Sequence, residues 1–295
     1  MPEDVESMRY FTEDTSVETV LSRMGEPENA RLAEVMRSVI AHLHAVVKEV
    51  EPTYGEWMAA IRFLTETGRM CDDKRQEFIL LSDVLGVSML VDAINTRRPD
   101  GATENTVLGP FHVDGAPDLA MGDTISQDGE GEPLVVRGRV LDGDGRPVEG
   151  AVIDTWQTSH DGFYDLQQPG VQPENNLRGV FRTGADGRFS YRSVKPSFYP
   201  IPDDGPVGQL LHGLGRGNIR PAHLHYIVGA PGFETVTTHI FVHDDPYLDS
   251  DAVFGVKESL IREFTRHDDP AQAAEFGVAN PFWTVETDFV LTPAA

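Results

Sequence analysis

The sequence is poor in cysteine, with Cys71 as the only one among 295 residues. A single cysteine excludes an intramolecular disulfide framework and any zinc or iron–sulfur site built from several thiolates. Basic residues are also scarce: 24 Lys and Arg stand against 48 Asp and Glu, for a formal net charge of −24. Because this charge repels phosphate backbones and anionic membrane surfaces, we expect neither a nucleic-acid nor a membrane partner.

Long hydrophobic runs and a secretory signal are missing too. The most apolar segment, residues 78–91, is interrupted by Ser82, Asp83, Gly86 and Ser88, which favours a buried helix over a membrane span. The first 15 residues are acidic and lack the basic start and apolar run of a signal peptide. We therefore expect a cytoplasmic protein.

The first hundred residues have the apolar spacing of helices. Between positions 30 and 50, apolar residues recur at intervals of three and four, which predicts a helix with one apolar stripe. Thr53 and Glu56 have the spacing of a capping box, which predicts the start of a second helix. The expected helices cover residues 16–24, 30–50, 53–70 and 75–95.

After residue 100 apolar residues alternate, and most of the glycines and prolines occur there. Many short strands separated by turn signals are typical of an antiparallel sandwich rather than of βαβ units. The expected strands cover residues 134–141, 151–158, 179–183, 188–194, 219–228, 236–242 and 283–291. The fold class is therefore expected to be α+β, with a helical domain at 1–105 and an antiparallel β-sandwich at 106–295.

The sharpest local feature is the pair His223 and His225. Two residues apart on one strand, their side chains share a face and stand about 6.6 Å apart along it. Imidazole is a ligand for zinc, iron, copper and nickel, although two half-buried histidines with satisfied hydrogen bonds are an equal alternative. A cupin site would require a glutamate shortly after His225, and the first one is Glu234.

Two tyrosines each follow a predicted strand. Tyr164 lies in HDGFYD, and Tyr199 lies among prolines in KPSFYPIP. A trivalent cation would deprotonate a phenol that otherwise titrates near pH 10. Taken singly, each tyrosine is more simply explained as an aromatic side chain packed under a loop.

Together these residues resemble the intradiol ring-cleaving dioxygenases, through the order Tyr164, Tyr199, Arg220-Pro-x-His223-x-His225. The stretches ENTVLGPFHVDGAP, AVIDTWQTSHDGFY and VHDDPYLDSDAVFGVK support the resemblance, which covers nearly the whole chain. It implies one Fe(III) per chain, held by the two tyrosines and two histidines. It also implies a homodimer formed through the helical domain, in some members with a bound phospholipid.

Within the family, LLSDVLG, VLGPF and YPIPDDG are similar to the hydroxyquinol-cleaving branch more than to the catechol-cleaving one. The resemblance implies O2-dependent cleavage of hydroxyquinol between its adjacent hydroxylated carbons, with catechol or a substituted catechol as the alternative substrate. A carboxylate on an otherwise apolar helix is costly without a partner. The resemblance places Asp83 in the substrate pocket, where it would accept a hydrogen bond from the third hydroxyl; the alternative is an exposed aspartate or one paired with an N–H group. Leu108 departs from the phenylalanine expected in that branch. The implied pocket wall is Leu80, Asp83, Val107, Gly109, Pro110, Phe111, Ile201, Val253 and Phe254.

The resemblance also assigns roles in the reaction. Tyr199 leaves the iron and acts as a base when the diol binds, and Arg220 stands beside the metal without binding it. A fixed cation there stabilises carbanion character on the ring. The alternatives are a paired surface arginine for Arg220, and for the whole chain a cupin-like Fe(II) or zinc enzyme or a binding module with an empty metal site.

Two further motifs are not expected to form binding sites. His239 and His243 lie on one strand beside the acidic turn HDDPYLDSD, which lacks EF-hand spacing and is expected to be a solvated loop rather than a calcium site. HGLGRGN has glycines but no Lys-Ser/Thr after them, so a flexible loop is expected rather than a phosphate-binding one.

Overall fold

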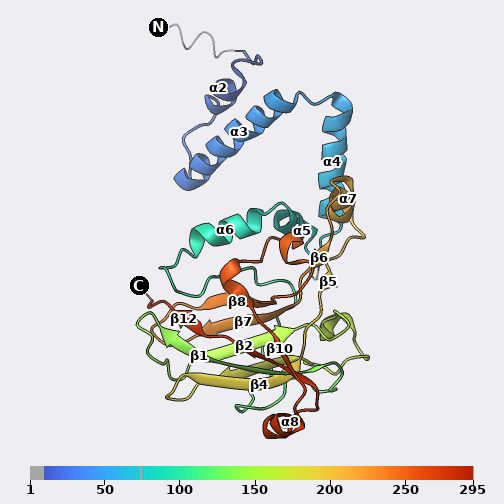
Figure 1. Cartoon of the computed structure of the whole chain (residues 1–295). Helices are drawn as coiled ribbons and strands as arrows, with labels where there is room; N and C mark the ends of the chain where they lie inside the picture. The colour runs from blue at the N-terminus through green and yellow to red at the C-terminus, as the bar shows by residue number, and fades with distance from the viewer. Residues whose placement is uncertain (1–9, 74, 295) are drawn as a thin grey trace. The chain divides into compact units, whose positions relative to one another are not determined.

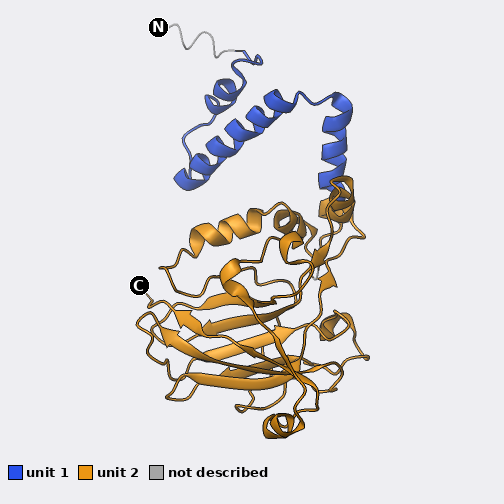
Figure 2. Cartoon of the chain, in the orientation of Figure 1, with its two compact units in different colours: residues 1–66 blue, residues 67–295 orange. Residues whose placement is uncertain are grey.

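A computed structural model describes residues 10–73 and 75–294 of the chain. Most of the N-terminal stretch assessed above for a signal peptide, residues 1–9, lies outside the described residues. The chain divides into two compact units, Met1–Glu66 and Thr67–Ala295 (Figure 2). No helix in the described ranges combines the length and the apolar character needed to cross a bilayer.

The first unit is helical, as predicted. It contains α2 (Ser16–Leu21), α3 (Ala30–Val50) and most of α4 (Tyr54–Arg69) (Figure 1). The predicted capping box at the start of α4 is confirmed: Glu56 Oε2 accepts from the Thr53 N–H at 2.7 Å, and Thr53 Oγ1 accepts from the Glu56 N–H at 3.3 Å. These bonds pair backbone groups at the helix start that have no intrahelical partner.

The apolar stripe of α3 is exposed in the single chain. Its members are Leu32, Val35, Met36, Val39, Leu43, Val46, Val47 and Val50, with exposed fractions from 39% to 65%. Only Ala33 on this helix is buried. A stripe of this size in contact with water is typical of a surface that another molecule covers.

The second unit begins with helices that differ from the expectation. The single helix predicted over 75–95 is two, α5 (Glu77–Val84) and α6 (Val87–Asn95), because Gly86 adopts a left-handed conformation with φ of +73°. Two short helices, α7 (Pro206–Gly213) and α8 (Pro270–Phe276), were not predicted. Each starts with proline, which favours the first helical turn.

The strands of this unit form two five-stranded sheets and one two-stranded sheet (Figure 1). The first contains β10 (Thr265–His267), β11 (Phe282–Glu286), β1 (Pro133–Asp142), β12 (Phe289–Leu291) and β4 (Arg188–Val194). The second has the order β3 (Arg178–Arg182), β2 (Val152–Gln157), β7 (His223–Gly229), β8 (Val236–Val242) and β9 (Ile261–Arg262). The third pairs β5 (Tyr199–Pro200) with β6 (Ile219–Arg220).

The expectation of purely antiparallel sheets is wrong, since both large sheets are mixed. β11 and β12 run parallel to β1, and β9 runs parallel to β8. The strand predicted over 283–291 breaks into β11 and β12 where Thr287 crosses Gly138. A Cβ on that glycine would lie 1.7 Å from the Thr287 carbonyl oxygen, so no other residue fits at position 138.

Both large sheets contribute to one hydrophobic core. Phe181 of β3 stacks on Tyr191 of β4 at 5.1 Å between ring centroids, and the hydroxyls of Tyr191 and Tyr226 lie 2.6 Å apart. Leu224 and Tyr226 of β7 point into this core. Because side chains alternate along a strand, His223 and His225 point to the opposite face, where the functional site lies.

Candidate metal centre

Strand β7 brings the two predicted histidines together. The strand expected over 219–228 is interrupted at Pro221, which has no N–H to donate, so that β7 begins at His223. The Nε2 atoms of His223 and His225 are 3.0 Å apart. His223 Nδ1–H donates to the Pro221 carbonyl at 2.6 Å, which directs Nε2 into the site.

The two predicted tyrosines lie beside these histidines, although they come from separate segments of the chain. Tyr164 precedes a 3-10 turn at Asp165–Gln167, and Tyr199 lies on β5. The Oη of Tyr164 is 2.8 Å from His225 Nε2 and 3.4 Å from Tyr199 Oη. The structure thus gathers four side chains that lie between positions 164 and 225 in the sequence.

This cluster fits a metal ion. Ligands that share one ion at 2.0–2.1 Å lie about 3 Å from one another, and the three distances given above, between 2.8 and 3.4 Å, match this spacing. All four residues are at least 97% buried. His225 Nδ1 is also buried without a hydrogen-bond partner. Several polar atoms converging in a dry site without enough partners are costly unless a cation binds them.

The protonation states of the cluster also suit a hard cation. Burial lowers the pKa of His223 to about 3, with the Arg220 charge adding to the shift, so its imidazole is neutral and able to bind a metal. Burial, followed by the neighbouring His239, holds the pKa of His225 well below its usual range. Burial, followed by the neighbouring Tyr199, raises the pKa of Tyr164 well above 10 although Arg220 and Arg178 oppose the shift, so its phenolate would need a metal ion bound directly to it.

Arg220 stands beside this cluster, as the sequence predicted. Its Nη1 lies 3.4 Å from Tyr199 Oη and 3.4 Å from His223 Nε2. Its opposite edge pairs with Asp251, with Nε 3.2 Å from Oδ1, and both side chains are 3% exposed. The alternative of a paired surface arginine is wrong. Asp251 belongs to the acidic turn that the sequence assigned to solvent.

His239 is a neighbour of the cluster that sequence reasoning set aside. It faces His225 across the β7–β8 pair, and its ring stacks on that of His223 at 4.6 Å. Ligand atoms of His223, His225 and His239 lie within 4.8 Å of one another. His243, four residues later, is exposed. The register of a hairpin that places His239 opposite His225 is the signal that could have identified it.

A cavity of about 990 Å³ opens beside the cluster, and Tyr199 and Arg220 line it. Eight of the predicted wall residues also line it: Leu80, Asp83, Val107, Gly109, Pro110, Phe111, Ile201 and Val253. Phe254 is not among the lining residues; its ring lies 4.7 Å from the Arg216 guanidinium and is half exposed. Burial raises the pKa of Asp83, although Ser88 and Arg220 oppose the shift.

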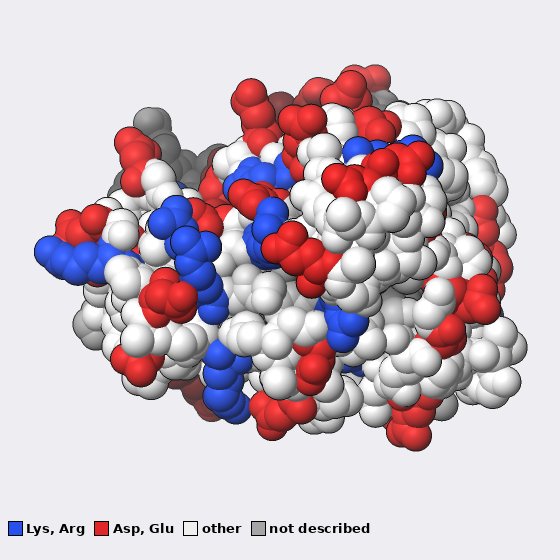
Figure 3. Space-filling model, turned by 60° about the horizontal axis from the view of Figure 1, so that its bottom comes forward, with Lys and Arg blue, Asp and Glu red and all other residues white. Residues whose placement is uncertain are grey.

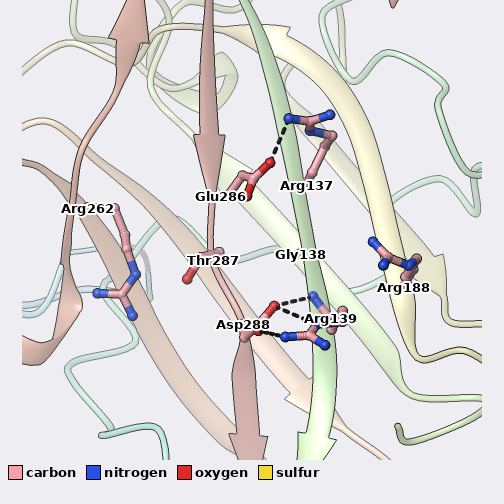
Figure 4. Close-up of a pocket in the computed structure, with 8 residues that line it drawn as sticks. All are labelled: Arg137, Gly138, Arg139, Arg188, Arg262, Glu286, Thr287 and Asp288. Atoms are coloured by element: carbon pink, nitrogen blue, oxygen red, sulfur yellow. Dashed lines mark hydrogen bonds and ion pairs between the residues drawn. The ribbon is translucent and has the colours of Figure 1, made fainter.

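A second cavity, of about 460 Å³, lies over β1 and the β11–β12 break (Figure 4). Three of its four arginines have an acidic partner: Arg137 pairs with Glu286 at 2.6 Å, Arg139 with Asp288 at 2.7 Å and Arg188 with Asp186 at 3.8 Å. Basic side chains also have acidic neighbours on the face shown in Figure 3. This groove shares no lining residue with the cavity beside the histidines, and we assign no chemistry to it.

Two sequence motifs have local structural roles. Asp245 of the acidic turn accepts from the Ala222 N–H at 2.9 Å, so the turn buttresses the start of β7. The glycine-rich stretch 212–218, expected to be a flexible loop, begins as the end of α7. Its Arg216 donates to the carbonyls of Val84 and Ala252.

Comparison with known proteins agrees with this geometry. Two family models match: "Catechol dioxygenase N terminus" over residues 29–103 and "Dioxygenase" over residues 107–293. The chain is 61% identical over 283 residues to a hydroxyquinol 1,2-dioxygenase of Rhizobium sp. (strain MTP-10005), covering 96% of each chain. It is 50% identical to a 6-chlorohydroxyquinol 1,2-dioxygenase of Cupriavidus pinatubonensis, covering 97% of this chain and 99% of that one.

Among solved structures, the hydroxyquinol 1,2-dioxygenase of Pseudomonas putida DLL-E4 matches with a TM-score of 0.88 and 47% identity, over 99% of this chain and 100% of the other. The cluster of two tyrosines and two histidines, the cavity beside it and these similarities agree with one another. The chain belongs to the intradiol ring-cleavage dioxygenases, a family of iron-dependent enzymes.

Proposed function

We propose that this protein cleaves hydroxyquinol, 1,2,4-trihydroxybenzene, between its adjacent hydroxylated carbons with O2, giving 3-hydroxy-cis,cis-muconate and its tautomer maleylacetate. The observation that carries the proposal is the buried Tyr–His cluster at the wall of a cavity that also contains the Asp83 carboxylate. The relatives named hydroxyquinol 1,2-dioxygenase support the same substrate.

The residues that we propose as metal ligands are Tyr164, Tyr199, His223 and His225, with one Fe(III) per chain. Phenolate is a hard anion and suits a trivalent ion, whereas a zinc or Fe(II) site of the cupin type would use a carboxylate in its place. When bound, Fe(III) would withdraw electron density from a chelated diolate, so that the ring itself can react with O2 without an external reductant. His239 takes no ligand role in this proposal, which follows the family resemblance; its Nδ1 lies 3.5 Å from Arg220 Nη2, and its Nε2 is buried without a hydrogen-bond partner.

Three side chains of the cavity then act on the substrate. When iron is bound, Tyr199 Oη would take up the proton of one substrate hydroxyl, and a hydroxide ion displaced from the site would take up the proton of the other. The Arg220 guanidinium stabilises the negative charge that develops on the ring carbon as the diol ketonises. Asp83 accepts a hydrogen bond from the third hydroxyl, and the apolar wall formed by Leu80, Ile201 and Val253 keeps water from the reacting carbon.

Catechol, or a substituted catechol, is the alternative substrate. Catechol has no third hydroxyl, so its binding would desolvate Asp83 without supplying the added hydrogen bond, which disfavours catechol. The experiment compares the two compounds: O2 consumption and the absorbance of the product are followed for equal concentrations of hydroxyquinol and catechol. Turnover of hydroxyquinol with a larger kcat/KM supports the proposal, and a larger kcat/KM for catechol contradicts the choice of substrate.

We infer that the exposed stripe of α3 is covered by a second copy of the chain in a homodimer. Burial of this apolar surface would contribute about 25 cal/mol for each Å² removed from water. A phospholipid between the helical segments is compatible with the same apolar surface, and mass spectrometry of an organic extract of the purified protein tests for it. We also propose that the protein is located in the cytoplasm, which cell fractionation would test.

We also propose that the chain divides functionally near residue 105, into helical residues 1–105 and catalytic residues 106–295. The gap between the two family matches, at 104–106, supports this division. The second compact unit begins earlier, at Thr67, and so contains α5 and α6 together with the sheets. The shared core of the two large sheets supports describing residues 106–295 as a sandwich.

A further inference from the structure

We propose that Asp251 is the positioning residue for Arg220: its carboxylate holds one edge of the guanidinium so that the other edge faces the reacting ring. This inference rests on the proposed function, in which Arg220 is the catalytic cation. The residue comes from a turn of the chain 31 positions away, which the sequence assigned to solvent.

The pairing divides the donors of Arg220 between two tasks. Asp251 Oδ1 accepts from Nε at 3.2 Å, and Oδ2 lies 3.4 Å from Nη2. The remaining nitrogen, Nη1, is the one that lies 3.4 Å from Tyr199 Oη. Because the guanidinium is planar and its donors form a fixed fork, holding the Nε–Nη2 edge determines where Nη1 points.

Asp251 is itself held in place by the backbone of the segment that follows it. Its Oδ1 accepts from the Val253 N–H at 3.3 Å, and its Oδ2 accepts from the Gly255 N–H at 2.8 Å. A Cβ at Gly255 would lie 2.8 Å from Arg220 Nη2, so only glycine lets the backbone approach this closely. The position of the carboxylate therefore does not depend on Arg220 alone.

The same segment forms part of the substrate cavity. Val253 lines it, and the Ala252 N–H donates to the Ile219 carbonyl at 3.1 Å, next to Arg220 in the chain. One carboxylate thus fixes the cation and the adjacent wall of the cavity relative to each other. That is the kind of second contact that keeps a catalytic group within a fraction of an ångström of its working position.

The balance of charge around Arg220 also supports a positioning role for Asp251. A guanidinium that is 97% buried needs a counter-ion, and in the described part of the chain Asp251 is the only residue whose carboxylate lies within 4 Å of it. With Asp251 in place the pair is neutral overall. Without it, Arg220 would be free to turn toward any anionic oxygen in the cavity, including those of a dicarboxylate product.

A double-mutant cycle tests the proposal, using Asp251→Asn, Arg220→Gln and the double variant, each purified with iron. We expect Asp251→Asn to lower kcat for hydroxyquinol about ten- to hundredfold, the usual effect of losing such an outer partner, and to leave KM nearly unchanged. We expect the double variant to have the same kcat as Arg220→Gln alone, because the effect of Asp251 on turnover passes through Arg220, whereas the amide that replaces its carboxylate can still accept from the Val253 N–H.

The iron content and visible spectrum provide a readout besides turnover. Iron content should stay at the wild-type value, while the tyrosinate absorption of Asp251→Asn shifts because Nη1 no longer lies steadily beside Tyr199 Oη. Asp249→Asn is the matched control: it removes the same charge from an exposed position of the same turn, and should leave both kcat and spectrum unchanged.

The outcomes separate the inference from the function on which it rests. A wild-type protein that does not turn over hydroxyquinol contradicts the proposed function. The positioning role is overturned if the wild type is active and the two substitutions act independently. In that case the kcat of the double variant is lower than that of Arg220→Gln by the same factor by which Asp251→Asn alone lowers the wild-type kcat. If Asp251→Asn does not fold, the double variant, which buries no unpaired charge, is compared with Arg220→Gln: equal kcat supports the role and a lower kcat refutes it.

Discussion

The hydroxyl oxygen of Tyr164 lies 2.8 Å from Nε2 of His225, although 61 residues separate the two in the chain. Aromatic neighbours fix both rings: Phe111 stacks on Tyr164 at 4.3 Å, and Trp156 stacks on His225 at 4.5 Å. The oxygen and the nitrogen that we propose as ligands therefore meet because of how the surrounding rings pack. Positioning of this kind reduces the freedom lost when a metal binds.

The first prediction concerns colour. Tyrosinate bound to Fe(III) gives a broad visible charge-transfer band, so the protein purified in air should be red. Tyr199→Phe should weaken and shift this band and abolish turnover, whereas Tyr54→Phe, at a position 91% exposed, should change neither. A colourless protein that stays colourless after iron loading would show that Tyr164 and Tyr199 are not ligands.

Removing the metal should lower thermal stability. An ion that binds only the folded chain stabilises it by mass action, so chelation under reducing conditions should lower Tm by about 5–10 °C and bleach the protein. Adding iron in air should restore both, as measured by calorimetry and absorbance. An unchanged Tm after complete removal of iron would show that the cluster binds no structural ion.

Arg220→Ala should keep the iron and the colour but lower kcat by about 10²–10³, the effect of losing one electrostatic donor to the transition state. Steady-state kinetics with hydroxyquinol and metal analysis check this. Arg146→Ala, at an exposed arginine of a surface turn, is the control and should retain wild-type kcat. Loss of iron from Arg220→Ala would show that the guanidinium supports the ligands rather than the reaction.

Asp83→Ala should reduce kcat/KM for hydroxyquinol about ten- to hundredfold, the worth of a hydrogen bond to a charged group, and leave catechol turnover nearly unchanged. Catechol serves as the internal control in the same protein. Equal losses for both substrates would assign Asp83 to the structure of the cavity instead.

The preference for hydroxyquinol should also depend on pH. Burial raises the pKa of Asp83, so this carboxyl becomes protonated at a higher pH than an ordinary aspartate. The ionised form is the better acceptor, and the hydroxyquinol-to-catechol ratio of kcat/KM should therefore be largest at neutral pH and decline as the pH falls through that raised pKa. In Asp83→Ala the ratio should lose this dependence.

Sedimentation should give a species of twice 32.5 kDa. Val46→Glu places a charge in the exposed stripe of α3 and should shift the protein toward monomer. Lys48→Glu changes a charge on another side of the same helix and should leave the dimer intact. A wild-type monomer at micromolar concentration would contradict the proposed assembly.

The helices of the first unit, the His-x-His pair and the family resemblance could be predicted from the amino-acid sequence alone. These features are local: apolar spacing, a capping box at Thr53 and Glu56, and alternation along one strand depend on neighbours within a few residues. The order of the tyrosines, the arginine and the histidines along the chain can also be read without a structure. The similarity to known family members confirms the family resemblance that this order indicates.

Contacts between groups far apart in the chain could not be predicted in this way, because they depend on how the whole chain folds. The parallel pairing of β11 and β12 with β1 depends on where the end of the chain returns, and no local pattern encodes that return. His239 reaches His223 through the register of two strands, and Asp251 reaches Arg220 through a turn whose acidic composition predicts exposure. A carboxylate such as that of Asp251 is buried only where the fold supplies an opposite charge. That charge, on Arg220, lies beside it only in the folded chain.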